Sequence, residues 1–137
     1  MKYLLDVNAL LALGHMDHEF HTRIITWLRA EKFPQLATCS ITELGFVRVL
    51  SQVPAYGFTV AGARSLLVQM KKNPALPLEF IADNHDISRL PGWVKSSAQT
   101  TDAHLSALAA ANGAALATFD EHIPGACLIF RRRDRQR

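Results

Sequence analysis

The sequence predicts an α/β protein in which helices cover a central, mainly parallel β-sheet. Short apolar runs such as residues 3–5 and 114–118 alternate with stretches of helical period. This alternation is typical of parallel sheets, because parallel neighbours need a crossover connection that is usually a helix. With 137 residues, 49% of them apolar, the chain can bury one core. We therefore expect a single domain over residues 1–130, followed by a basic tail at 131–137.

The first half of the chain predicts two strands and a series of helices. Phe20, Ile24 and Trp27 recur at helical spacing, and Ser40 with Glu43 three residues later is typical of a capping box. The expected elements are a strand at 3–5, a helix at 8–13 ending at Gly14, a helix capped by Asp17 or His18, a strand at 36–39, a helix from Ser40 to Leu50, and a helix from 60 to 70 capped by Thr59.

The second half predicts the remaining strands and one further long helix. Gly113 stands where a glycine commonly ends a helix, directly before an apolar run. The expected elements are a strand at 78–81, a short helix at 83–90, a polar loop at 91–99, a helix capped by Thr100 or Thr101, a strand at 114–118 and a last strand at 127–130.

The basic charge of the chain is concentrated at its C-terminal end. The formal net charge is +3, but the last seven residues hold five Arg, and the rest has 10 basic against 11 acidic residues. Such a tail attracts phosphate backbones or is simply a solvated end. Cys39 and Cys127 do not form the pattern of a disulfide scaffold, so we expect reduced thiols in a cytoplasmic protein. No apolar run reaches the roughly 20 residues of a membrane helix, so we expect no membrane association.

Four carboxylates stand where strands give way to loops or helices. They are Asp6, Glu43, Asp102 and Asp120. Side chains at the carboxyl ends of parallel strands meet at one edge of the sheet. Carboxylates gathered there repel one another unless a cation lies between them, and oxygen ligands suit Mg²⁺. We therefore expect a metal site that acts on phosphate esters, because a bound divalent ion stabilises the phosphoryl oxygens and activates water.

Each carboxylate also has a local alternative. Glu43 can belong to the capping box of Ser40, Asp102 can be a favourable charge at a helix N-terminus, and Asp120 can be a turn residue. Asp6 is the hardest to explain in this way, because a carboxylate after an apolar strand is costly to bury without a partner. Asn8 and Thr118 are candidates for orienting the carboxylates as outer-shell donors.

Three segments, taken in their order, resemble the PIN-domain ribonucleases of the VapC toxin type. They are LLDVNALLAL at the start, TELGFVRVL in the first third and TTDAHLSALAAANGAALATFD near the end. The resemblance covers about residues 2–130. It matches Asp6, Glu43, Asp102 and Asp120 to the acidic quartet of the family, and Asn8 to its polar position two residues after the first Asp. The tail RRRDRQR is outside the pattern.

The resemblance implies a three-layer α/β/α fold and a metal-dependent endoribonuclease, the toxin of a type II toxin–antitoxin system. It implies Mg²⁺ as the cofactor, with Mn²⁺ as a substitute, and RNA as the substrate. It also implies a homodimer and a cognate VapB-type antitoxin that covers the active-site groove. Asp6 and Asp102 would then be the principal metal ligands, with Glu43 and Asp120 completing the site.

Two other functions remain open from the sequence. A non-catalytic PIN-like module would bind RNA or an antitoxin peptide, and the helix at 40–50, which is apolar on two faces, offers surface for such a partner. A metal-dependent phosphatase or DNA nuclease would use the same carboxylates, because a metal ion at the phosphate does not distinguish RNA from DNA. A 2′-deoxy substitution at the scissile position separates the two nucleases.

Overall fold

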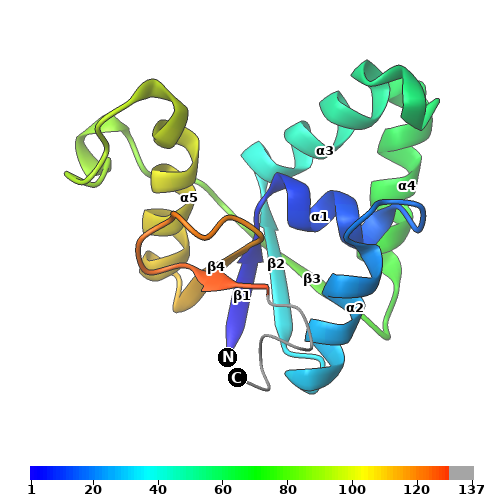
Figure 1. Cartoon of the computed structure of the whole chain (residues 1–137), viewed down its shortest axis with the longest axis horizontal. Helices are drawn as coiled ribbons and strands as arrows, with labels where there is room; N and C mark the ends of the chain where they lie inside the picture. Colours follow the sequence, from blue (N-terminus) through cyan, green and yellow to red (C-terminus); the bar gives the residue numbers. More distant parts are fainter. Residues whose placement is uncertain (130–137) are drawn as a thin grey trace.

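The centre of the molecule is a five-stranded sheet in which every pair of neighbours is parallel, in the order β3-β2-β1-β4-β5 (Figure 1). The structure is a computed structural model and describes residues 1–129. The strands are β1 (Lys2–Leu5), β2 (Gln35–Cys39), β3 (Leu78–Ile81), β4 (Ala114–Thr118) and β5 (Cys127–Leu128). The helices are α1 (Val7–Gly14), α2 (His21–Ala30), α3 (Ser40–Gln52), α4 (Val60–Lys72) and α5 (Thr100–Ala111), with 3-10 turns at Pro54–Tyr56, Ile87–Arg89 and Ser97–Gln99.

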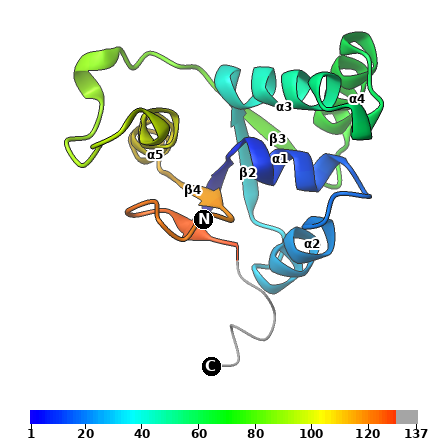
Figure 2. The same ribbon diagram turned by 45° about the horizontal axis from the view of Figure 1, so that its top comes forward.

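Helices cover both faces of this sheet, so the fold has three layers. Figures 1 and 2 show α5 on one face and α1 to α4 on the other. Side chains alternate between the faces along a strand. In β1, Tyr3 and Leu5 therefore join the core beneath α1 to α4, and Leu4 joins the core beneath α5. The predicted α/β/α architecture is confirmed.

The strand order reverses its direction at β1. From β1 the chain adds β2 and β3 on one side, and it later returns to place β4 and then β5 on the other side. The backbone N–H of Asp6 donates to the Ala117 carbonyl at 3.2 Å, which continues the β1–β4 pairing one residue past the end of β1. Ligands of open α/β sheets bind at such a reversal, outside the carboxyl ends of the strands.

A close contact between α1 and α3 fixes the two helices that follow β1 and β2. A Cβ atom on Gly45 would lie 2.5 Å from Cγ2 of Val7, so only glycine permits this approach. Val7 directly follows Asp6, and Gly45 is two residues after Glu43. The contact therefore sets the relative position of two of the candidate site residues.

Two predicted helix starts in the first part of the chain are wrong. α1 begins at Val7, because the Asp6 side chain caps it, and not at Asn8. α2 begins at His21 after Phe20, and neither Asp17 nor His18 caps it. Instead, Nδ1 of His18 accepts a hydrogen bond from the Phe20 N–H at 3.0 Å, which forms a local turn before the helix.

In the second part, one prediction is confirmed and two are wrong. Thr59 caps α4, as expected, by accepting from the Gly62 N–H. Gln99 is the N-cap of α5, so the expected cap at Thr100 or Thr101 is wrong. Thr100 already lies inside the helix, and its hydroxyl donates to the Ser97 carbonyl. The short helix expected at 83–90 is reduced to the 3-10 turn Ile87–Arg89.

The C-terminal part agrees with the prediction as far as the structure describes it. Gly113 follows α5 with a positive φ of 68°, which suits a glycine at the end of a helix. β5 ends at Leu128, and the predicted extension to residue 130 and the tail at 131–137 lie outside the described residues. Over residues 1–129, no helix has the length and apolar character needed to cross a membrane.

Candidate active site

Asp6 occupies the centre of the candidate site, between the carboxyl ends of β1 and β4. Its Oδ1 accepts a hydrogen bond from the Ala9 N–H at 2.8 Å, which caps α1. The residue is only 7% exposed. The pKa of its carboxyl is raised from 3.8 to about 6, chiefly by burial and also by the charges of Asp102 and Asp120, against the hydrogen bonds from Thr118 and Ala9 that lower it. A carboxyl in this state is destabilised as an anion until a cation reaches it.

Thr118 links two of the candidate carboxylates. It is the last residue of β4 and is 1% exposed. Its side chain hydrogen-bonds with the Asp6 carboxyl, and its Oγ1 accepts from the Asp120 N–H at 3.0 Å. This one hydroxyl therefore orients Asp6 and the start of the segment that carries Asp120.

Asp102 and Asp120 reach the same place from two other elements. Asp102 is half-buried in the first turn of α5, and its pKa is raised by burial and then by the charge of Asp120. Asp120 is exposed just after β4, and its Oδ1 accepts from the His122 N–H at 2.9 Å. The local roles considered for both residues are therefore present, and they coexist with the electrostatic coupling to Asp6.

Glu43 is held by different partners. Its Oε2 accepts from the Thr38 hydroxyl at 2.5 Å and from Nζ of Lys71 at 2.7 Å. It does not form the capping box expected with Ser40. That motif is formed one residue earlier, by Cys39 and Thr42, whose hydroxyl accepts from the Cys39 N–H at 3.0 Å. The Glu43 carboxylate is thus free of the cap and turns toward α4.

Lys71 and Thr38 are the functional neighbours that sequence reasoning missed. Thr38 is fully buried in β2, five residues before Glu43, and the alternation of faces along a strand offered a weak signal for it. Lys71 comes 28 residues after Glu43, in the last turn of α4. A Lys there has an ordinary explanation as a favourable charge at a helix C-terminus, so the sequence carries no signal for its contact.

The structure brings Asp6, Asp102 and Asp120 close enough for their charges to interact, whereas Glu43 is paired with Lys71. Asn8 lies exposed in the first turn of α1. Within residues 1–129 no three His, Cys, Asp or Glu side chains stand close enough to form a ready-made ligand set. The donors nevertheless fit a hard divalent ion: they are all oxygens, and burial together with neighbouring carboxylates raises the pKa values of Asp6 and Asp102.

Known proteins with similar sequences point in the same direction. A family model described as PIN domain matches residues 3–127. Ribonuclease VapC44 of Mycobacterium tuberculosis (strain CDC 1551 / Oshkosh) is 38% identical over 129 residues, which cover 90% of this chain and 89% of the relative. Ribonuclease VapC38 of strain ATCC 25618 / H37Rv is 40% identical over 124 residues, covering 85% and 84%. Ribonuclease VapC39 of the same strain is 32% identical over 136 residues, covering 88% and 89%.

Proposed function

The chain belongs to the PIN-domain family, in its VapC ribonuclease branch, and we propose that it is the endoribonuclease toxin of a type II toxin–antitoxin system. The observation that carries this proposal is the convergence of Asp6, Asp102 and Asp120 at the reversal of strand order, where the charges of Asp102 and Asp120 help to raise the pKa of Asp6 and the charge of Asp120 helps to raise that of Asp102. Three relatives named as ribonucleases match most of the chain and support the choice of RNA. We place the activity in a single nuclease domain over residues 1–130, in the cytoplasm.

We assign Mg²⁺, with Mn²⁺ as a substitute, to the acidic site. Asp6 and Asp102 would hold the ion, and Asp120 and Glu43 would complete the site around it. When bound, the ion supplies charge to the phosphoryl oxygens and lowers the pKa of water, which are the two needs of phosphodiester hydrolysis. Its fit rests on the all-oxygen donor set and on the burial of Asp6, which is 7% exposed.

The residues of this chain perform the orientation. The Ala9 N–H and Thr118 hold the Asp6 carboxyl in one direction, and α5 carries Asp102 on a rigid first turn. Thr38 and Lys71 hold Glu43 at the side of the site nearer β2. In hydrolysis an oxygen of water bonds to phosphorus, one P–O ester bond breaks, and the proton of the water must pass to a base. A pre-oriented carboxylate is suited to receive that proton.

The partner of the toxin is proposed to be a VapB-type antitoxin, and the apolar surface between α3 and α4 supports a protein partner. A cavity of about 550 Å³ lies there, beside Glu43 and Lys71. Leu44 and Val60 line it and are 68% and 62% exposed, which is unusual for large apolar side chains. A homodimer remains part of the proposal, and light scattering of the purified chain tests it.

The same surface favours one alternative function, a PIN-like module that binds RNA or an antitoxin peptide without cleavage. The two functions differ in what the carboxylates must do. A binding module needs no carboxylate-dependent metal binding, whereas the nuclease requires it.

The test is cleavage of a total RNA pool by antitoxin-free protein with Mg²⁺ or Mn²⁺. We expect discrete fragments that disappear with EDTA and in Asp6→Asn. The matched control is Asp17→Asn, which changes an exposed aspartate outside the site and should cut like the wild type. Cleavage by Asp6→Asn into the same fragments and at the same rate as the wild type would contradict the assignment. Folded wild-type protein that cuts with neither ion would favour the binding module.

A further inference from the structure

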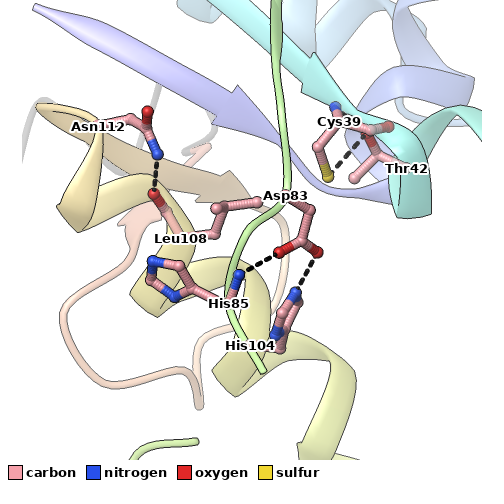
Figure 3. Close-up of polar contacts among 7 residues, drawn as sticks. All are labelled: Cys39, Thr42, Asp83, His85, His104, Leu108 and Asn112. Atoms are coloured by element: carbon pink, nitrogen blue, oxygen red, sulfur yellow. Dashed lines mark hydrogen bonds and ion pairs between the residues drawn. The ribbon is translucent and has the colours of Figure 1, made fainter. Parts of the chain in front are cut away.

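A second group of polar side chains lies between α5 and the segment that follows β3. Figure 3 shows Asp83 directed at His104, with His85 beside them. Oδ2 of Asp83 is 2.5 Å from Nε2 of His104, and its Oδ1 accepts from the His85 N–H at 3.0 Å. The two imidazole rings meet edge to face, with centroids 6.2 Å apart. Asp83 therefore fixes both histidines in place.

The imidazole of His85 has no hydrogen-bond partner within residues 1–129. Both ring nitrogens are buried, and neither has a partner among residues 1–129. A buried polar atom without a partner costs folding free energy, so it calls for a specific explanation. A ligand with a polar edge that reaches this ring is one such explanation.

A cavity of about 330 Å³ adjoins the cluster. Its walls combine His85 and His104 with apolar side chains, including Ile41 and Ile87, and with the hydroxyl-bearing Thr101. This volume and this mixture of apolar walls and a few polar groups suit a small organic ring. Ile87 is 80% exposed, which is a second feature that packing within the chain does not explain.

The cavity lies next to the acidic site. Thr101, in its wall, directly precedes Asp102 in the first turn of α5. A strand whose phosphate lies at the aspartates would therefore have a neighbouring nucleotide beside the cavity.

The charges near the cavity select the kind of ligand. Asp83 and Asp86 line it, so a phosphate group would meet like charge. A metal ion would have to displace the hydrogen bond between Asp83 and His104, so Zn²⁺ binding is one of the outcomes of the test below. A flat, uncharged ring with N–H groups on its edge fits the aromatic and apolar walls and the acceptor oxygens.

We propose that this cavity binds one unpaired nucleobase of the RNA, next to the scissile phosphate. The proposal rests on the proposed function for the identity of the strand. His85 and His104 give the base an aromatic wall, and Ile87 gives it an apolar one. A base edge that reaches His85 satisfies ring nitrogens that have no partner among the described residues.

Binding of two probes by anisotropy tests this without any cleavage. The first probe is a fluorescein-labelled RNA hexamer of random sequence, and the second is a base-free ribose-phosphate hexamer with the same phosphates. All proteins carry Asp6→Asn to prevent cutting. We expect His85→Leu and Ile87→Ala each to raise the Kd for the RNA hexamer roughly tenfold, which is typical of losing one stacked base, and to change the Kd for the base-free hexamer far less.

Controls separate this result from damage to the fold. Asn84→Ala alters an exposed residue of the same segment that does not line the cavity, and it should bind both probes like the parent. The thermal unfolding midpoint of His85→Leu should be no lower than that of the parent, because two unpartnered nitrogens are removed. Ile87→Ala changes a side chain that is 80% exposed and outside both cores.

Three results would overturn the proposal. They are equal fold-changes on both probes, no change on either, or retention of one equivalent of Zn²⁺ by the parent that His85→Leu loses, which would make the cluster a metal site. The proposed nuclease activity is tested separately, because its absence would be seen in the cleavage of total RNA and not in these binding affinities.

Discussion

Two regions at the carboxyl edge of the sheet place their carboxylates in opposite electrostatic surroundings. Between β1 and β4, the described charges that shift the pKa of Asp6 are those of Asp102 and Asp120, and both raise it. At the end of β2, Glu43 instead has Nζ of Lys71 at 2.7 Å. Within residues 1–129, the first region has no cation that lowers the pKa of Asp6, whereas the second region has Lys71 beside Glu43. Under the proposed function, the first region would be the part of the site that requires a metal, and the second would be already neutralised.

The largest expected effect concerns the pH dependence of stability in metal-free protein. The pKa of Asp6 is raised to about 6 in the folded state from 3.8, so the folded state binds the proton more tightly than the unfolded state. Its contribution is present below pH 4 and is lost as the pH rises through 6. The loss is about 3 kcal/mol at neutral pH. Asp6→Asn keeps an acceptor at the N-cap, so its free energy of unfolding should not show this decrease as the pH rises.

Urea unfolding from pH 4 to pH 7 in EDTA measures this difference. Asp17→Asn should follow the wild type, while Asp6→Asn should show a flatter profile and gain stability relative to it as the pH rises. Parallel curves for wild type and Asp6→Asn would mean that Asp6 carries no unbalanced charge, and the contrast between the two regions would fail.

The next effect concerns Thr118, which belongs to the first region only. Thr118→Val removes the hydroxyl that bonds with the Asp6 carboxyl and accepts from the Asp120 N–H. Groups that orient metal ligands typically contribute about 10- to 100-fold to affinity or activity. We expect a loss in that range in RNA cleavage, with Thr118→Ser recovering most of it. Equal rates for the Val and Ser variants would remove Thr118 from the site.

The smallest expected effect comes from removing the cation of the second region, so that its carboxylate resembles those of the first. Lys71→Met leaves Glu43 without its cation, while Lys71→Arg preserves the charge. The two side chains are 31% and 21% exposed, so solvent screens the pair and the loss of unfolding free energy should stay below about 1 kcal/mol. The freed carboxylate should raise Mn²⁺ affinity by roughly threefold. A fall in Mn²⁺ affinity, measured by titration, would show that Lys71 supports the metal instead of substituting for it.

Local signals explain why much of the fold was predictable. Apolar strands followed by Asp6 and Asp120, the Thr59 cap and the Gly113 helix end are all features of adjacent residues, and the structure shows each where the sequence placed it. Adjacent residues also mislead where two local patterns compete. Ser40 with Glu43 and Cys39 with Thr42 are both plausible caps for one helix, and only the second forms.

Contacts between segments that are distant in the chain could not be predicted from the sequence. Lys71 meets Glu43 across 28 residues, and His104 meets Asp83 across 21. Both depend on how helices dock on the sheet, and no periodicity in the chain encodes that. The expected helix at 83–90 failed for the same reason, since Asp83 uses both carboxylate oxygens to hold His85 and His104 and the segment forms only a short 3-10 turn.

The most direct test of the central claim is calorimetric titration of metal-free protein with Mn²⁺, comparing Asp102→Asn with Glu43→Gln. The account predicts one carboxylate-dependent site in the wild type, lost or weakened at least about 100-fold in Asp102→Asn. It predicts a much smaller loss in Glu43→Gln, whose carboxylate already has Lys71 as its cation. Unchanged Mn²⁺ binding by folded Asp102→Asn would contradict the claim that the three aspartates are the part of the site that needs a metal.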